Sequence, residues 1–164
     1  MSELPFEIPT NRAELVKLFL ESRAALALQW AGLSEEEMTR RPGPQPEWSV
    51  KDMIGHICWW ESFALARILV IAAGQAVALI NDYDALNQQV EAYVRDLPLE
   101  AVLAQFAANE ALILGMIERY TFAEWTDSES PNYEGFTLMR LLGGNTFGHY
   151  YEHIPDLEAY REQL

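Results

Sequence analysis

The sequence predicts an all-α protein, a four-helix bundle with short extra helical segments, and three observations lead to this fold class. Apolar residues recur at three- and four-residue steps along four long stretches, capping residues precede these stretches, and no stretch has the alternating polarity of a β-strand. A chain of 164 residues, half of them hydrophobic, is long enough to bury one core without disulfides. We therefore expect a single domain over residues 1–164.

The first helix is expected to begin at Thr10 or Asn11, because Asn11 and Glu14 have the spacing of a capping box. The positions that follow at helical spacing are Leu15, Leu18, Phe19, Ser22, Leu26 and Trp30. Gly32 and the proline-rich residues 39–46 cannot continue this helix, since proline removes a backbone donor and clashes with the preceding turn. A loop is expected there.

Ser49 is the expected start of the second helix, because its hydroxyl can accept the third amide and Asp52 can return the bond. The residues at three- and four-residue steps after this start share one broad face, and they are Met53, His56, Trp60, Phe63 and Arg67. His56 is therefore expected to point inward.

Residues 81–96 are polar and are expected to form a short crossover helix or a linker. A third long helix should follow, with Pro98 in its first turn. Its apolar positions are Leu99, Val102, Leu103, Phe106, Leu112, Ile113 and Met116. Residues 121–135 are rich in Ser, Asp, Glu and Pro, which predicts a loop.

The fourth helix is expected to be capped by Thr137 and to run to His153. The residues that mark its course are Leu138, Leu141, Leu142, Asn145 and His149. Pro155 should end or kink this helix, and residues 156–160 resemble one more helical piece that packs against the bundle.

Charge and cysteine content restrict the partners and the compartment. Acidic residues outnumber basic ones 25 to 11, and a formal net charge of −14 should repel phosphate backbones and anionic membranes, so neither nucleic acid nor membrane is expected as a partner. Residues 1–9 lack the features of a secretory signal, and the apolar run at residues 68–80 is too short and broken to span a bilayer. Cys58 stands alone, so a reducing cytoplasm fits best.

The three histidines of the chain form the candidate site. His149 and His153 are four residues apart, which places both imidazoles on one helical face within reach of one ion. The second and fourth helices of a bundle can lie side by side, so His56 can join them. Three neutral nitrogens leave open positions for water or substrate, as in catalytic zinc sites.

Other interpretations of these residues stay open. A core histidine is more often satisfied by a backbone carbonyl than by a metal. Asp52 and Asn145 each lie one turn before a candidate ligand and can orient His56 and His149, although Asp52 also fits as the capping partner of Ser49. Several aromatic residues can line an apolar pocket over the metal or simply form core, and they are Trp48, Trp59, Trp60, Trp125, Tyr150 and Tyr151.

Two motifs carry a family resemblance. The chain resembles the DinB/YfiT-like superfamily in its second-helix motif, which here reads EWSVKDMIGH at residues 47–56, followed by WWE at residues 59–61. The chain also resembles the fourth-helix motif of that superfamily, particularly as seen in the DUF1706 or ClbS/DfsB branch, with NTFGHYYEHIPDL at residues 145–157. The spacing between the motifs also fits, so the likeness covers nearly the whole chain.

This resemblance implies an up-down-down-up bundle, often a homodimer, that holds a divalent ion such as zinc or nickel with a histidine triad. His56, His149 and His153 match the triad positions. Relatives include thiol-dependent S-transferases and isomerases that use a low-molecular-weight thiol, while others are linked to stress and toxin resistance. Fold alone does not determine activity.

Three functions therefore compete. The first is a metal-dependent enzyme acting on a small molecule, of the thiol-dependent transferase or hydrolase type. The second is a non-catalytic protein that binds and sequesters a small molecule or metal in stress or toxin resistance. The third is a structural or interaction bundle whose histidines are merely core residues.

Overall fold

The computed structural model describes residues 7–78, 80–127 and 137–164, and within these ranges it contains helices and no strand. The helices are α1 (Arg12–Leu28), α2 (Glu35–Thr39), α3 (Val50–Ala72), α4 (Tyr83–Arg95), α5 (Leu99–Arg119), α6 (Phe122–Thr126), α7 (Leu138–Asn145) and α8 (Phe147–Arg161). The predicted all-α fold class is confirmed.

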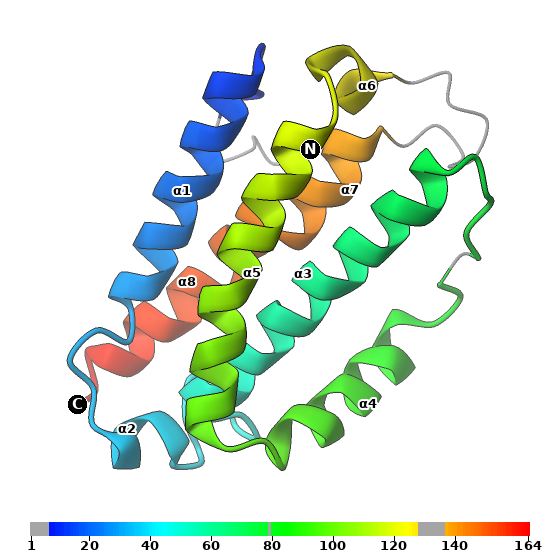
Figure 1. Cartoon of the computed structure of the whole chain (residues 1–164). Coiled ribbons are helices and arrows are strands. Elements are labelled where there is room, and N and C mark those ends of the chain that lie inside the picture. Colours follow the sequence, from blue (N-terminus) through cyan, green and yellow to red (C-terminus); the bar gives the residue numbers. More distant parts are fainter. Residues whose placement is uncertain (1–6, 79, 128–136) are drawn as a thin grey trace.

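The central helix is α3, which contacts α5, α7, α4, α2 and α8. The first helix, α1, contacts both α5 and α8, so these long elements close around one core. Figure 1 shows α1 and the α7–α8 pair running from top to bottom, while α3 and α5 run the opposite way. The shorter α4 packs on the outside of α3.

Local capping signals begin most of the helices. The Asn11 side chain accepts from the Glu14 amide at 2.9 Å, and Ser49 and Asp52 form the reciprocal capping box at the start of α3. Ser34 also forms such a box, and it begins α2, which the sequence analysis did not predict. Thr121 begins α6 in the same way, so the predicted loop is wrong for these residues because a local cap outweighs their polar composition. The rest of that loop, residues 128–136, lies outside the described residues.

The predicted fourth helix is two helices, with a break at Thr146 (φ −128°, ψ −109°). Close packing explains the break. A Cβ on Gly143 would lie 2.6 Å from the Phe147 ring, and a Cβ on Gly148 would lie 2.8 Å from the Gly143 carbonyl oxygen. These glycines let the last turn of α7 and the first turn of α8 approach one another without side chains between them.

Pro155 lies inside α8, which continues to Arg161, so of the two predicted effects, an end or a kink, the end is wrong. Leu157 and Tyr160 lie beyond the proline and are 1% and 3% exposed. The tyrosine hydroxyl donates to the Glu37 carbonyl oxygen at 2.6 Å. Burial of this last turn against the core and α2 offsets the backbone hydrogen bond that proline cannot make.

Two helices, α3 and α5, are long and apolar enough to cross a membrane by length and composition alone. Of the apolar segment of α3 that meets this test, 67% is buried inside the fold, whereas for the corresponding segment of α5 the buried share is 28%. Core helices of soluble proteins pass the same test, so α3 is accounted for by its position. The apolar run at residues 68–80 is interrupted where α3 ends, at Gly74 with φ 75°.

Candidate metal centre

The three histidines come together between α3 and α8. His56 lies on α3, and His149 and His153 lie one turn apart on α8. The Nε2 atom of His149 is 3.2 Å from that of His56 and 2.9 Å from that of His153. One ring nitrogen from each residue lies within 4.8 Å of the others, and His56 and His149 are only 4% and 9% exposed. The expected convergence of the three rings is therefore present.

The separations of 2.9 Å and 3.2 Å suit one metal ion. A tetrahedral ion with metal–nitrogen bonds of about 2.0–2.1 Å holds its nitrogen ligands about 3.3 Å apart. Three imidazoles are also the protein ligand set of catalytic zinc sites that keep a fourth position for water or substrate. The residues present therefore fit a divalent ion in their number and in the two shorter separations, and all three nitrogens lie within 4.8 Å of one another.

Burial keeps the three rings neutral, which is the form that binds metal. Loss of hydration lowers the pKa of His56 to about 3, and the charge of His153 adds to this. Burial likewise lowers the pKa of His149 well below its ordinary value, with repulsion from the other two rings. Burial lowers the pKa of His153 too, although Asp156 opposes the shift.

A small pocket of about 210 Å³ opens beside His56 and His149, and we call it the histidine pocket. Its other lining residues are Trp60, Tyr83, Asn87, Gly144, Asn145 and Glu152. The Trp60 indole donates to the Asn87 side-chain oxygen at 3.1 Å, and its ring stacks on Tyr83 with centroids 5.9 Å apart. One wall of this pocket is therefore built by α4.

Sequence reasoning missed Tyr83 and Asn87, because the polar segment around them gave no sign that it would pack beside the histidines. Of the aromatic residues considered as pocket walls, Trp48 and Trp60 lie against His56, with ring centroids 4.8 Å and 6.3 Å away. Trp125 instead donates to the Ile117 carbonyl oxygen at 3.2 Å in the core. Cys58 is buried, which raises the pKa of its thiol and makes it a poor nucleophile.

The two residues expected to orient the imidazoles have other partners. Asp52 accepts bonds from the Ser49 amide and hydroxyl at 2.8 Å and 2.7 Å and from Arg41 at 2.8 Å, so its capping role is the one observed. The Asn145 amide donates to the Leu141 carbonyl oxygen at 2.7 Å. The Nδ1 atoms of His56 and His149 are buried without a hydrogen-bond partner in the described part of the chain. Packing holds these rings in place, with Trp48 lying against His56.

A cluster of buried polar side chains joins four helices on the core side of the site. Glu61 of α3 accepts bonds from Arg23 of α1, from the Tyr150 hydroxyl of α8, and from Asn109 of α5 at 2.8 Å. The Arg23 guanidinium also donates to the Tyr150 hydroxyl at 2.9 Å and lies over the Phe106 ring. Because Tyr150 follows His149, this polar cluster ties α8 to α3 next to the point where the histidines meet.

Comparison with solved structures finds the same fold. A crystal structure of an uncharacterised protein from Escherichia coli UTI89 superposes with a TM-score of 0.83 at 19% identity, covering 95% of each chain. The colibactin self-resistance protein ClbS, solved in complex with a double-stranded DNA, gives 0.82 at 19% identity, covering 96% of this chain and 99% of that one. DfsB, described as a sibling lethal factor precursor, gives 0.79 at 15% identity, covering 95% and 98%.

The ClbS complex corrects one expectation. The net charge of −14 predicts that nucleic acid is not a partner, and a protein of the same fold bound to double-stranded DNA contradicts this prediction. The physical reason is that a summed charge does not describe the charge of one face. Salt also screens the interaction between charges more than about 10 Å apart. One face of a protein that is acidic as a whole can therefore still bind the phosphates of DNA.

No curated protein is significantly similar to the sequence. A sequence profile of the DinB superfamily matches residues 18–154, a range that includes all three histidines, the whole first motif and residues 145–154 of the second. This match covers most of the chain and agrees with the fold of ClbS and DfsB. The chain belongs to the DinB superfamily.

Proposed function

We propose that this protein binds one divalent metal ion, zinc or nickel, through His56, His149 and His153 and acts as a metal-dependent enzyme on a small molecule. The observation that carries the proposal is the meeting of three neutral imidazole nitrogens, with neighbouring separations of 2.9 Å and 3.2 Å, beside an open pocket. Imidazole is a good ligand for both metals. Membership of the DinB superfamily and the potential ligand set support the same conclusion.

Different residues of the chain have different roles at such a site. The three histidines hold the ion, and the Trp48 and Trp60 rings cover His56 and exclude water from that side. The Asn87 and Asn145 side chains offer polar groups that can orient a substrate in the histidine pocket. A bound zinc or nickel ion would lower the pKa of a thiol or water that it coordinates. The proposed reaction is therefore transfer of a low-molecular-weight thiol to a small electrophile, or hydrolysis.

The His149→Ala variant tests this function, with Glu158→Ala as its control because Glu158 is an exposed residue on the same helix. We expect tag-free wild-type protein and the control to retain about one ion per chain and to consume a thiol and an electrophile together. The His149→Ala variant should lose both properties while its circular dichroism stays helical. Undiminished turnover in that variant would remove the proposal of metal-dependent catalysis.

A second candidate is a non-catalytic protein that sequesters a small molecule or the metal in stress or toxin resistance. The likeness to ClbS, a colibactin self-resistance protein, favours it. It predicts protection that saturates at one equivalent of protein, without a chemically altered product. The binding assay should include a double-stranded DNA oligonucleotide, because ClbS was solved with one.

We also propose a cytoplasmic homodimer in which residues 1–164 form one domain. The single buried cysteine suits a reducing compartment, and α5 keeps an apolar, largely exposed face that a second copy can cover. Light scattering of the purified protein tests the dimer. A mass of one chain at high concentration would contradict it.

A further inference from the structure

A second and larger pocket adjoins the histidine pocket. It has a volume of about 500 Å³, and we call it the apolar pocket. Its apolar lining comes from Ile8, Pro9, Met139 and Phe147, together with the backbone of the glycines in α7 and α8. This volume is within the range of about 300–1,000 Å³ in which proteins bind small organic ligands.

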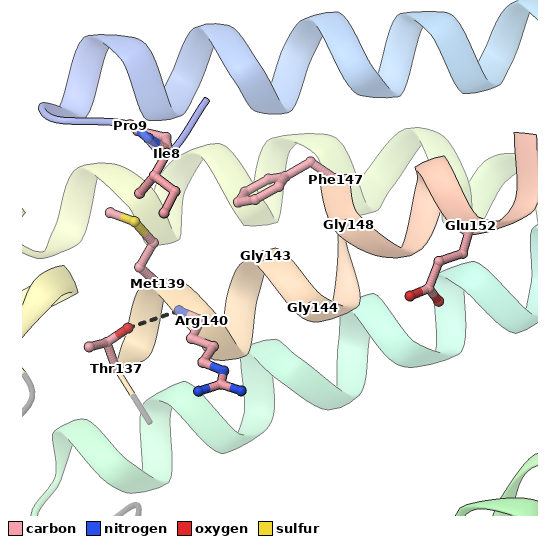
Figure 2. Close-up of a pocket in the computed structure, with 10 residues that line it drawn as sticks. All are labelled: Ile8, Pro9, Thr137, Met139, Arg140, Gly143, Gly144, Phe147, Gly148 and Glu152. Atoms are coloured by element: carbon pink, nitrogen blue, oxygen red, sulfur yellow. Dashed lines mark hydrogen bonds between the residues drawn. The ribbon is translucent and has the colours of Figure 1, made fainter. Parts of the chain in front are cut away.

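The two pockets share two lining residues, Gly144 of α7 and Glu152 of α8. Figure 2 shows Ile8 and Met139 near one end of the apolar pocket and Glu152 near the other, with Gly144 between them. Glu152 also lines the histidine pocket, next to His149. The shared residues therefore form a junction between the apolar pocket and the candidate metal ligands.

Gly144 differs from the glycines around it. Gly143 and Gly148 are required by packing, because a Cβ on either would lie under 3.0 Å from its neighbour. A Cβ on Gly144 would meet nothing within 4 Å, so packing does not require glycine there. Nor does helical backbone favour glycine, which has about the lowest helix propensity after proline. Because Gly144 has no side chain, the junction of the two pockets stays open.

We propose that the two pockets form one elongated binding site for an amphipathic small molecule. Its metal-binding group, such as a thiol, hydroxyl or carbonyl, enters the histidine pocket, and its apolar part passes Gly144 into the apolar pocket. The Glu152 carboxylate at the junction favours a ligand that is neutral or cationic at that point, whereas Arg140, which lines the apolar pocket but not the histidine pocket, carries the opposite charge. This inference rests on the proposed function, because the ligand's polar end is held by the metal.

Gly144→Leu tests the site by placing a branched side chain at the junction. Leucine is a better helix former than glycine, so the variant should fold at least as well as the wild type. Gly115→Leu is the matched control, since Gly115 is also exposed, lies in α5, and would place its Cβ with nothing within 4 Å. The probes are zinc and a series of straight-chain alkyl hydroxamic acids, and the readout is affinity by calorimetry.

In zinc-loaded wild type and Gly115→Leu, affinity should rise about three- to fourfold for each added methylene until the apolar pocket is filled. In Gly144→Leu this rise should be lost, while acetohydroxamic acid, which has almost no tail, should bind within about twofold of its wild-type affinity. Gly144→Ala should give an intermediate dependence on chain length.

Two results would overturn the inference, and they are distinguishable from failure of the proposed function. Equal chain-length dependence in Gly144→Leu and wild type would mean that the tail does not pass the junction. No chain-length dependence in any variant would mean that the apolar pocket takes no part, although zinc binding would still support the metal site. Failure of the wild type to bind zinc when it is titrated with the metal alone would overturn the proposed function and this inference with it.

Discussion

The Nε2 atoms of His56 and His149 lie 3.2 Å apart, although 93 positions separate these residues in the chain. Each residue belongs to a different helix, and α3 and α8 are held side by side by a buried hydrogen bond from Tyr150 to Glu61. The metal site and the polar cluster are therefore neighbouring parts of one interface. Changes in either should be measurable in stability and in metal affinity.

Chelation should lower the melting temperature. An ion that binds the folded chain and not the unfolded one adds about 2.7 kcal/mol of stability when its free concentration is 100 times its Kd. For a chain of this size about 1 kcal/mol corresponds to a shift of about 2–4 °C, so removing the metal should cost several degrees. Differential scanning calorimetry of zinc-loaded and chelated protein measures this. An unchanged midpoint would favour the interpretation of the histidines as core residues.

Mild acid should destabilise the metal-free protein. Burial lowers the pKa of His56 to about 3 in the fold, whereas an unfolded histidine titrates near 6.5. Between these values the unfolded chain binds more protons, so stability is full above about pH 6.5 and is lost as pH falls. Urea unfolding from pH 7.5 to 5.5 measures the slope in a range where carboxylates titrate little. The slope should weaken in His56→Gln, and an identical slope would contradict this account.

Breaking the polar cluster on one side should be costly. Glu61→Leu leaves the Arg23 guanidinium, 2% exposed, without its buried carboxylate partner, and the loss should be about 3–5 kcal/mol. The double variant Arg23→Met with Glu61→Leu should be less destabilised than the sum of the single changes, because no buried charge remains unpaired. Denaturant unfolding of all three proteins gives the coupling energy. Glu110→Gln, at a 49% exposed partner of Arg23, is the control and should cost under about 1 kcal/mol.

Removing the cap of α3 should affect stability without affecting the metal. Ser49→Ala deletes the hydroxyl that bonds to the Asp52 amide and carboxylate, and such a loss costs about 0.5–2 kcal/mol. Ser34→Ala removes the equivalent group from the short, exposed start of α2 and should cost less. Urea unfolding and elemental analysis together test this. A fall in metal content in Ser49→Ala would mean that the cap also positions His56.

The helix starts were predictable because capping is local. Asn11, Ser49 and Thr137 each accept a hydrogen bond from an amide three residues later, and that spacing is visible in the sequence. The break at Thr146 was not predictable, since it depends on how Phe147 packs over Gly143 after the chain has folded.

The same contrast applies to the candidate site. The histidine spacing and the family motifs indicated the three ligands, whereas the contribution of α4 to the pocket depends on tertiary packing that no local pattern encodes. Arg23 could have been found, because it lies four residues after Phe19 and three before Leu26 on a face of apolar residues. A charge at such a position indicates a buried partner, which is Glu61.

X-ray absorption at the zinc edge, on tag-free protein loaded with one equivalent of zinc, tests the metal site most directly. The account predicts a first coordination shell containing three imidazole nitrogens at about 2.0–2.1 Å, reduced to two in His153→Ala. A shell of oxygen atoms alone, or a spectrum unchanged by that substitution, would contradict it.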